Sequence, residues 1–350
     1  MSGDVRIRKQ GRAGWITLAR PRALNALSYD MCTAIEAALD AWRGDAEVAL
    51  VVIDAEGDKA FCAGGDIQQL YDTGRAGDFA YGRRFWADEY RLNAKIARYP
   101  KPFVALMHGF VMGGGVGIAC HGSHRVVCES TRMAMPECGI GLVPDVGGSL
   151  LLARAPGRAG EYLGLTGARM APDDAIYSCF ADYYAPQLKW QDVRAALIES
   201  GDPGVIDGFA EAPPEGKLRA LQPEIDACFG GEGLHDIVAS LRAADSDFAR
   251  DTLAVIARNS PLSMACTVEI IHRLRAISAD IGQALEMEYR FTWRSMEQGD
   301  FLEGIRAAII DKDREPKWKH TLDSLPGAAV LQMLQPLGEN SLTLEEETGR

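Results

Sequence analysis

The stretch FVALMHGFVMGGGVGIACHGSHRVVC, residues 103–128, contains the alternation of elements on which the fold depends. It opens with a short β-rich apolar run at 103–108 and closes with another at 124–128. Between them, three glycines at 113–115 precede an apolar run with helical character. The stretch therefore predicts a strand, a glycine turn, a short helix and a second strand.

The same alternation extends toward the N-terminus. Residues 49–55 form a further β-rich run, and residues 28–43 have helical periodicity, with Ser28 as a favourable N-cap. Another helical pattern lies at 88–98, and residues 1–20 predict a pair of alternating strands. Strands that alternate with helices are typical of a layered α/β domain.

The second half of the chain has a different character. Beyond about residue 155 the strand signals nearly vanish, and the clearest helices are expected at 260–277 and 281–298. A stretch rich in Gly and Pro at 201–217 predicts a loop or linker. The predicted organisation is a core, a helical C-terminal region and a flexible tail, at residues 1–200, 201–325 and 326–350.

The composition excludes several classes of protein. With 37 basic and 49 acidic residues, the net charge of −12 argues against nucleic-acid binding, which depends on clustered Lys and Arg. No apolar run reaches the ~18 residues of a membrane span, and the N-terminus does not predict a secretory signal. The eight cysteines form no C-x-x-C pair, which indicates reduced thiols in a cytoplasmic protein.

Two glycine-rich turns follow apolar strands, FCAGGDI at 61–67 and HGFVMGGGVGIACHG at 108–122. Neither matches a dinucleotide fingerprint or a P-loop, and either could be simply a tight turn. In the second, however, the glycine N–H groups lie at a helix N-terminus and have no partner within the helix. Two such N–H groups from separate loops would form an oxyanion hole, which stabilises charge developing on a thioester oxygen.

The stretch AMPECGIGLVPDVGG, residues 134–148, places Glu137 and Asp145 among glycine, proline and apolar residues. Burial of an unpaired charge costs several kcal/mol or forces the group to become neutral. The presence of two acids in such a stretch therefore has to be explained. A chemical explanation is that one of these carboxylates acts as a base or a nucleophile. A structural reason is that Glu137 caps the next turn and Asp145 is the N-cap of the helix that begins VGGSLLLARA.

Other chemistries fit the sequence poorly. Cys120, His121, His124 and Cys128 match no standard zinc spacing, and their segment runs from helix into strand, so no metal site is predicted. The G-x-S-x-G motif of serine hydrolases is absent. His108 is expected to support the core or the site rather than to act as a base.

Four motifs occur together in the order LARPRALNALS, FCAGGDI, GFVMGGGVGIA and MPECGIGLVPDVGG. The segment LTGARMAPDDAIYSCFADYYA at 165–185 continues the similarity. On these motifs the chain resembles the crotonase (enoyl-CoA hydratase/isomerase) superfamily. The resemblance implies an α/β fold, a crotonase-like spiral of ββα turns with a helical C-terminal region, and acyl-CoA thioester substrates. It implies no cofactor beyond the CoA of the substrate; relatives commonly form homo-oligomers, although the longer C-terminus here could cover that interface.

Carried over residue by residue, the resemblance assigns the oxyanion-hole N–H groups to Gly65 and Gly114. It places the residues around PRALN and AGGDI against the adenine and pantetheine of CoA, with Arg22 as a cation near the phosphates. The further CoA contacts that it implies are Ala23, Ala63, Asp66 and Ile67.

One departure from the hydratases bears on the reaction. Those enzymes carry two glutamates, and Gly117 occupies the position of the first, so addition of water would lose one of its acid–base groups. This pattern, with DEYRLN at 88–93 and FLEGIRAAIIDKDREPKW at 301–318, resembles the branch of the superfamily that hydrolyses 3-hydroxyisobutyryl-CoA. The resemblance then extends over about residues 5–320.

In that branch Glu89, Gly114, Glu137 and Asp145 would line the substrate pocket. Glu137 would attack the thioester carbonyl or activate a water, and the sequence leaves both mechanisms open. Asp145 would hold the 3-hydroxyl of the substrate or orient Glu137.

We therefore expect a cytoplasmic acyl-CoA thioester hydrolase that acts on a short branched 3-hydroxyacyl-CoA, such as 3-hydroxyisobutyryl-CoA in valine breakdown. Two alternatives stay open. One is an enoyl-CoA isomerase or atypical hydratase with Glu137 as its only base. The other is a non-catalytic acyl-CoA-binding protein.

Overall fold

The computed structural model describes residues 3–344, whose elements form two compact units. Each unit is assembled from three separate stretches of the chain. Unit 1 comprises Met1–Asp66, Leu92–Ala134 and Arg169–Arg219, and unit 2 comprises Ile67–Arg91, Met135–Ala168 and Ala220–Arg350. The domain boundaries predicted at residues 200 and 325 remain predictions. Residues 345–350 of the predicted tail lie outside the described residues.

Unit 1 contains two β-sheets. The larger has six strands in the order β1 (Val5–Gln10), β2 (Ala13–Leu18), β3 (Leu50–Ala55), β5 (Phe103–Met107), β7 (His124–Val127) and β9 (Tyr183–Tyr184). The smaller has three strands in the order β4 (Ala60–Cys62), β6 (Phe110–Met112) and β8 (Arg132–Ala134). The pair β1–β2 is antiparallel, as residues 1–20 predict, and the other pairs are parallel.

The chain passes through the two sheets alternately. β3 is followed by β4, β5 by β6, and β7 by β8, so each pair adds one strand to each sheet. Helices α2 (Gln68–Arg75) and α3 (Phe79–Ala97) separate the first two pairs, and α4 (Gly114–Ala119) separates the second from the third. Parallel strands need such crossovers, and repetition of the unit produces the ββα spiral. The strands predicted at 49–55, 103–108 and 124–128 are confirmed.

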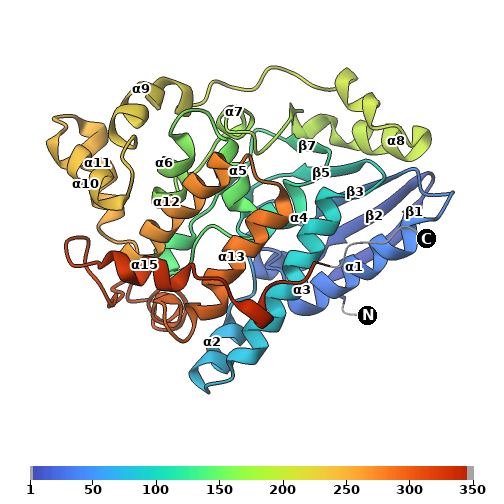
Figure 1. Cartoon of the computed structure of the whole chain (residues 1–350). Coiled ribbons are helices and arrows are strands. Elements are labelled where there is room, and N and C mark those ends of the chain that lie inside the picture. The colour runs from blue at the N-terminus through green and yellow to red at the C-terminus, as the bar shows by residue number, and fades with distance from the viewer. Residues whose placement is uncertain (1–2, 345–350) are drawn as a thin grey trace. The chain divides into compact units, whose positions relative to one another are not determined.

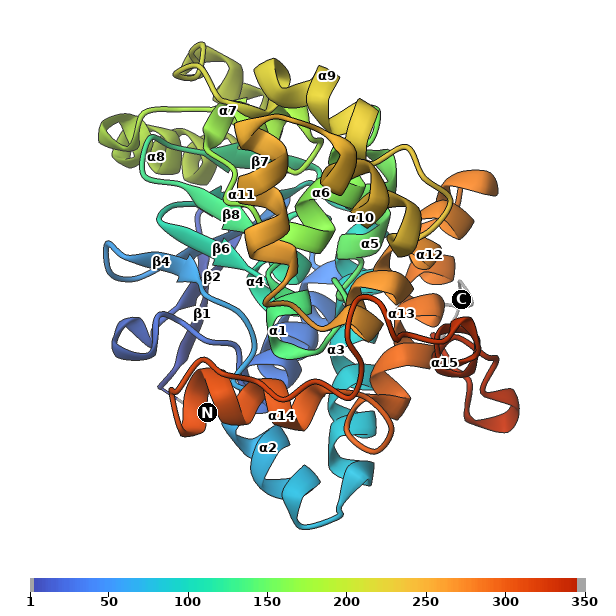
Figure 2. The same ribbon diagram turned by 90° about the vertical axis from the view of Figure 1, so that its left-hand side faces the viewer.

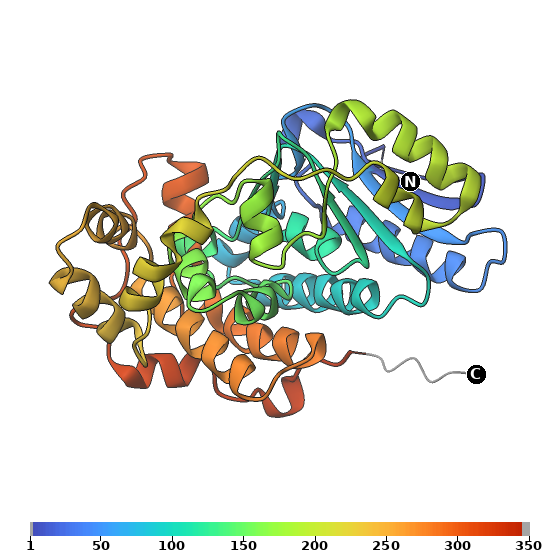
Figure 3. The ribbon, with the colours of Figure 1, turned by 90° about the horizontal axis from the view of Figure 1, so that it is seen from above.

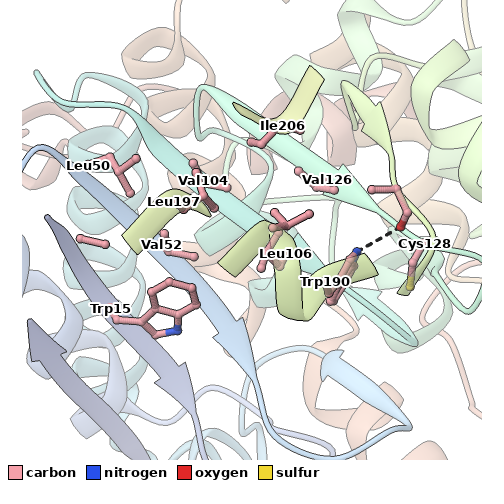
Figure 4. Packing of buried hydrophobic residues seen from close by; sticks show 13 residues of the cluster. Trp15, Leu50, Val52, Val104, Leu106, Val126, Cys128, Trp190, Leu197 and Ile206 are labelled. Atoms are coloured by element: carbon pink, nitrogen blue, oxygen red, sulfur yellow. Dashed lines mark hydrogen bonds between the residues drawn. The ribbon is translucent and has the colours of Figure 1, made fainter. Parts of the chain in front are cut away.

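Helices cover both faces of the larger sheet, which is why every residue of β2 and β3 is buried. Alternate residues of a strand point to opposite faces. Gly14 lies against Trp42 of α1 (Tyr29–Arg43), where an added Cβ would be 2.5 Å from the indole. Trp15 packs instead with Trp190 and Leu197 of α8 (Trp190–Ser200). Figures 1 and 3 show α1 and α8 on opposite faces of this sheet, and Figure 4 shows the core beneath α8.

Unit 2 is helical. Helix α12 (Pro261–Ala276) packs against α5 (Gly148–Arg154), α6 (Ala159–Thr166), α10 (Leu234–Ala243), α13 (Ile281–Ser295) and α15 (Gly327–Met333) (Figure 2). The hydroxyl of Ser260 and the carboxylate of Asp280 accept hydrogen bonds from the first turns of α12 and α13, which fixes where both helices begin. Both helices were predicted. Helices α11 (Asp247–Ile256) and α14 (Phe301–Ile305) also belong to unit 2, α7 (Pro172–Tyr177) belongs to unit 1, and α9 (Leu218–Cys228) begins at the end of unit 1 and continues into unit 2.

Two further predictions concern helix starts. Ser28 is the N-cap of α1, and its hydroxyl accepts a hydrogen bond from the N–H of Met31. The start predicted for the helix at 88–98 is wrong, because α3 begins at Phe79. Gly82 and the aromatic residues of this first part have low helix propensity, which hides the helix from a propensity argument. Tertiary packing explains Gly82, since an added Cβ would lie 2.2 Å from the Met296 side chain.

Candidate active site

Four acidic side chains lie buried together in unit 2, each at most 5% exposed. Glu89 is on α3, Glu137 begins a short 3-10 helix at Glu137–Ile140, Asp145 is in the loop before α5, and Glu288 is on α13. The charge of Asp145 raises the pKa of each of the other three, so the groups are close enough to influence one another. We call these four residues the carboxyl cluster. It brings together Glu89, Glu137 and Asp145, the three acids singled out from the sequence.

Glu137 is held in a tight turn. Pro136 occupies the N-cap position of its 3-10 helix, and Gly141 ends that helix with a φ of 75°. The structural alternative in which Glu137 is the cap is therefore wrong. Oε2 of Glu137 is buried and accepts no hydrogen bond. Burial, and then the charges of Asp145 and Glu288, raise the pKa of Glu137 well above its usual value.

Asp145 is fixed by a tyrosine rather than by a helix. The hydroxyl of Tyr90 donates a hydrogen bond to Oδ2 of Asp145 at 2.8 Å. Burial raises the pKa of Asp145 to about 7, against the opposing effect of this hydrogen bond. The prediction that Asp145 is the N-cap of the next helix is wrong, because that position belongs to Gly147. Val146 and Gly147 both have positive φ, 54° and 78°, and this turn delays the helix.

The turn after Asp145 is strained and anchored. A β-branched residue such as Val146 is rare in the left-handed region, where the strain costs about 1–3 kcal/mol. The N–H groups of Gly147 and Ser149 donate to the carboxylate of Glu288, at 2.8 Å and 3.1 Å. The hydroxyl of Ser149 also donates to Glu288. Burial raises the pKa of Glu288 to about 8, although these hydrogen bonds act in the opposite direction.

Helix α3 contributes Glu89 to the carboxyl cluster and also carries Tyr90, which contacts Asp145. Oε1 of Glu89 is buried without a hydrogen-bond partner, and burial, followed by the charge of Asp145, raises its pKa well above the usual value. The ring of Tyr90 meets that of Tyr289 edge to face, with centroids 6.1 Å apart.

Sequence reasoning missed Tyr90 and Glu288. For Glu288 a signal existed: Ile281, Leu285, Glu288, Thr292 and Ser295 follow the 3–4 spacing of one helix face, and all five are buried. An acid in such a stripe is unusual enough to be noticed. For Tyr90 no local pattern points to Asp145, because the contact joins residues far apart in the chain.

The predicted oxyanion-hole residues lie in unit 1. Gly65 follows β4 and Gly114 follows β6, and the parallel pairing of these strands brings the two loops to one edge of the smaller sheet. The bridge between Leu27 and Gly65 uses the carbonyl of Gly64 and the N–H of Asp66, not the N–H of Gly65. Gly114 is the first residue of α4, so its N–H has no acceptor within the helix. Close contact excludes a side chain at Gly115, whose Cβ would lie 2.4 Å from the Cys62 carbonyl.

A pocket of about 430 Å³ in unit 1 involves part of the predicted CoA-binding set. Arg22 lines it, as does Lys59, which was not predicted, while Ala23, Ala63, Asp66 and Ile67 are not among its lining residues. Asp66 instead forms an ion pair with Arg20 at 3.1 Å. Ile67 occupies the N-cap position of α2 and is partly buried.

The two cysteines of segment 120–128 contact sulfur and hydroxyl groups of neighbouring side chains. The thiol of Cys120 contacts the sulfur atoms of Met107 and Met133, and that of Cys128 lies 3.2 Å from the hydroxyl of Ser130. Among residues 3–344, no three His, Cys, Asp or Glu side chains form a group that could hold a metal ion. None of the eight cysteines forms a disulfide. Across the same described range, every helix is too short or too polar to cross a membrane.

The raised pKa values of the carboxyl cluster predict that the protein unfolds at a lower temperature at pH 8 than at pH 6. The pKa values of about 7 for Asp145 and about 8 for Glu288 exceed the ordinary 3.8 and 4.5, so the folded state binds these protons more tightly than the unfolded chain. This stabilisation is complete below about pH 4 and is lost as the pH rises through 7 and 8. Each group changes the free energy of unfolding by at most ~1.4 kcal/mol per pH unit.

Scanning calorimetry of the wild type and of Asp145→Asn at both pH values measures this effect. The variant should lose part of the pH dependence. The lowered pKa of Glu161, about 2, acts in the opposite direction but only below pH 4.5, outside the measured window. Equal unfolding temperatures at pH 6 and pH 8 in the wild type would contradict the prediction.

A ββα spiral with paired glycine loops and a helical C-terminal region defines a protein of the crotonase class. The chain belongs to the enoyl-CoA hydratase/isomerase family, which matches residues 13–334.

The chain is similar over nearly its whole length to known relatives and to solved structures. The chain is 38% identical to the mitochondrial 3-hydroxyisobutyryl-CoA hydrolase of Gallus gallus, over 98% of this chain and 91% of that protein. Its fold matches a solved enoyl-CoA hydratase from Rhodobacter sphaeroides, with a TM-score of 0.93 and 55% identity over 97% of this chain and 100% of that one. A carnitinyl-CoA dehydratase from Mycobacterium thermoresistibile is also similar, with a TM-score of 0.94 and 41% identity over 99% and 100%.

Proposed function

We propose that this protein hydrolyses 3-hydroxyisobutyryl-CoA to 3-hydroxyisobutyrate and CoA. The observation that carries the proposal is Glu137, a buried carboxyl group with one oxygen that accepts no hydrogen bond and a raised pKa. Such a group is a strong nucleophile or base once it is ionised. The name of the Gallus gallus relative, 38% identical over nearly the full length, supports the choice of substrate.

In the favoured mechanism, Glu137 attacks the thioester carbonyl carbon. The N–H groups of Gly65 and Gly114 stabilise the negative charge on the carbonyl oxygen. The carbon–sulfur bond then breaks, CoA leaves as the thiolate, and a mixed anhydride forms on Glu137. Water opens the anhydride, which releases the acid and restores the carboxylate. In the alternative, Glu137 removes a proton from a water that attacks the carbonyl directly.

Asp145 and Glu89 complete the acyl site in this proposal. Asp145, fixed by Tyr90, accepts a hydrogen bond from the 3-hydroxyl of the substrate. Glu89 lines the same side of the acyl group, where burial raises its pKa well above the usual value.

The CoA moiety would bind unit 1 through its phosphates. Arg22 and Lys59 would supply the cations at the pocket of about 430 Å³, which Glu56 and Asp58 also line. The family resemblance alone supports CoA contacts by Ala23, Ala63, Asp66 and Ile67. The reaction as written needs no cofactor beyond this CoA. The setting that we propose is valine breakdown in the cytoplasm, by a protein that could assemble into a homo-oligomer; cysteines without disulfides suit a reducing compartment.

Hydration of an enoyl-CoA is a second candidate, because the solved structure at 55% identity is that of a protein named enoyl-CoA hydratase. Against it stands Gly117, a buried residue of α4 with no acid–base group. One assay separates the candidates. The protein is incubated with 3-hydroxyisobutyryl-CoA and with crotonyl-CoA, and free thiol and enoyl absorbance are followed. Thiol release supports hydrolysis, loss of absorbance without thiol supports hydration, and silence in both supports binding alone.

Position 117 provides a separate prediction. Gly117→Glu should add measurable hydratase activity or slow hydrolysis, since a carboxyl group would enter the site from α4. Steady-state kinetics with both substrates measure the outcome, and Gly117→Gln is the control that adds the same bulk without the acid. Unchanged hydrolysis with an unchanged KM would place position 117 away from the acyl group.

A further inference from the structure

Glu288 is the member of the carboxyl cluster to which neither the sequence motifs nor the predicted site assigns a role. We propose that Glu288 is a positioning residue: it anchors the loop that carries Asp145 and thereby sets the selectivity for a 3-hydroxylated acyl group. This inference rests on the proposed function and deepens it.

The anchor is a set of three hydrogen bonds across 139 to 141 positions of sequence. Oε2 of Glu288 accepts from the N–H of Gly147, and Oε1 accepts from the N–H and the hydroxyl of Ser149. These N–H groups belong to the start of α5, where a helix has no internal acceptors. Glu288 is fully buried, so water cannot replace it as their acceptor.

The loop needs this anchor because its conformation is unfavourable by itself. Val146 lies between Asp145 and Gly147 with a φ of 54°, and such strain persists only where surrounding contacts impose it. Asp145 is thus held at two points. Tyr90 holds its carboxylate directly, and Glu288 holds the backbone that follows it. Loss of the second point would leave Asp145 attached to Tyr90 but free to move with its loop.

The charge of Glu288 also acts on the cluster. The groups that it faces are Asp145 on the anchored loop, Glu137 on the 3-10 helix and Tyr90 on α3. Arg273 of α12 forms an ion pair with Glu269, and Arg290 of α13 forms one with Glu286. Because the pKa of Glu288 is about 8, this charge acts on Glu137 only near and above that pH.

The test compares Glu288→Gln with the wild type on two substrates, 3-hydroxyisobutyryl-CoA and isobutyryl-CoA, which lacks the hydroxyl. The wild type should favour the hydroxylated substrate in kcat/KM, and the variant should lose on the order of tenfold of that preference. Glu286→Gln, on the same helix but partly exposed and paired with Arg290, is the matched control and should behave as the wild type.

The double variant Glu288→Gln/Asp145→Asn separates positioning from general damage to the fold. If Glu288 acts through Asp145, adding Glu288→Gln to Asp145→Asn should change the selectivity little, because the two effects are not additive. Full additivity would overturn the proposal. If Glu288→Gln does not fold, Ser149→Ala removes one of the three donors, and it should lower the selectivity in the same direction by a smaller factor.

The outcomes distinguish this inference from the proposed function. If the wild type hydrolyses the substrate and Glu288→Gln keeps its selectivity, the positioning role is wrong and the proposed function stands. If the wild type releases no CoA, the proposed function fails. Hydrogen exchange at residues 145–149 then tests whether Glu288 anchors this loop. Faster exchange in Glu288→Gln supports the anchoring role, and unchanged protection overturns it.

Discussion

Replacement of Glu137 with Gln is expected to abolish thioester hydrolysis while acyl-CoA binding is retained. The amide keeps the shape of the side chain but can neither attack a carbonyl nor take a proton from water. Loss of the group should lower kcat by at least ~1,000-fold, as for other catalytic bases and nucleophiles. Release of free thiol measures the rate, and titration calorimetry with the intact substrate measures binding by the inactive variant.

Glu137→Asp serves as the control, because it keeps the charge and shortens the side chain. It should retain more activity than Gln if the carboxylate is what matters. A folded Glu137→Gln protein with near-normal turnover would remove Glu137 from the mechanism altogether.

The two mechanisms for Glu137 can be separated chemically. Hydroxylamine added during turnover intercepts a mixed anhydride, and a hydroxamate found on Glu137 would rule out a purely general-base route. A single turnover in ¹⁸O water adds a second observation, since attack of water on the enzyme side of the anhydride labels Glu137. Label in the released acid alone is compatible with both routes, so the trapping experiment carries more weight.

Replacement of Gly114 with Pro is expected to lower kcat by ~100–1,000-fold, the usual effect of losing one oxyanion-hole donor. Gly114 is the first residue of α4, a position where proline suits the helix and removes an N–H that the helix does not use. The matched control is Gly114→Ala, which also adds a side chain but keeps the N–H. The two variants are compared by thiol release and by circular dichroism.

The difference between these variants is the informative quantity. A loss in Gly114→Pro that Gly114→Ala does not share points to the N–H group. Equal losses in both would indicate crowding of the α4 N-terminus, and near-normal turnover of a folded Gly114→Pro protein would contradict the oxyanion assignment.

Elements defined by local patterns were predictable from the sequence, and those defined by distant contacts were not. The apolar runs of β3, β5 and β7 and the cap at Ser28 are local features, and the structure contains them where they were expected. The first half of α3 was missed because a methionine more than 200 residues away, Met296, determines that Gly82 is acceptable there. Propensity carries no information about such a partner.

The same distinction applies to the site. Glu137 and Asp145 are visible because acids in a Gly- and Pro-rich apolar stretch are conspicuous. The local reading of Asp145 as a helix cap failed because no sequence rule predicts a positive φ at a valine such as Val146. Tyr90 and Glu288 join the site through contacts across 55 and 141 positions, which a reading of short windows cannot detect.

The separation between Glu288 and its loop has a consequence for biosynthesis. A ribosome that adds ~5–20 residues per second needs roughly 7–30 s to pass from Gly147 to Glu288, which lie 141 positions apart. Throughout that interval the nascent chain presents the strained turn and its unpaired N–H groups without their acceptor. A chain that stalls before residue 288 emerges can form strands, glycine loops and the Tyr90–Asp145 hydrogen bond, yet the N–H groups of Gly147 and Ser149 lack Glu288 as their acceptor. Such truncated products should be readily cleaved by proteases near residues 145–149.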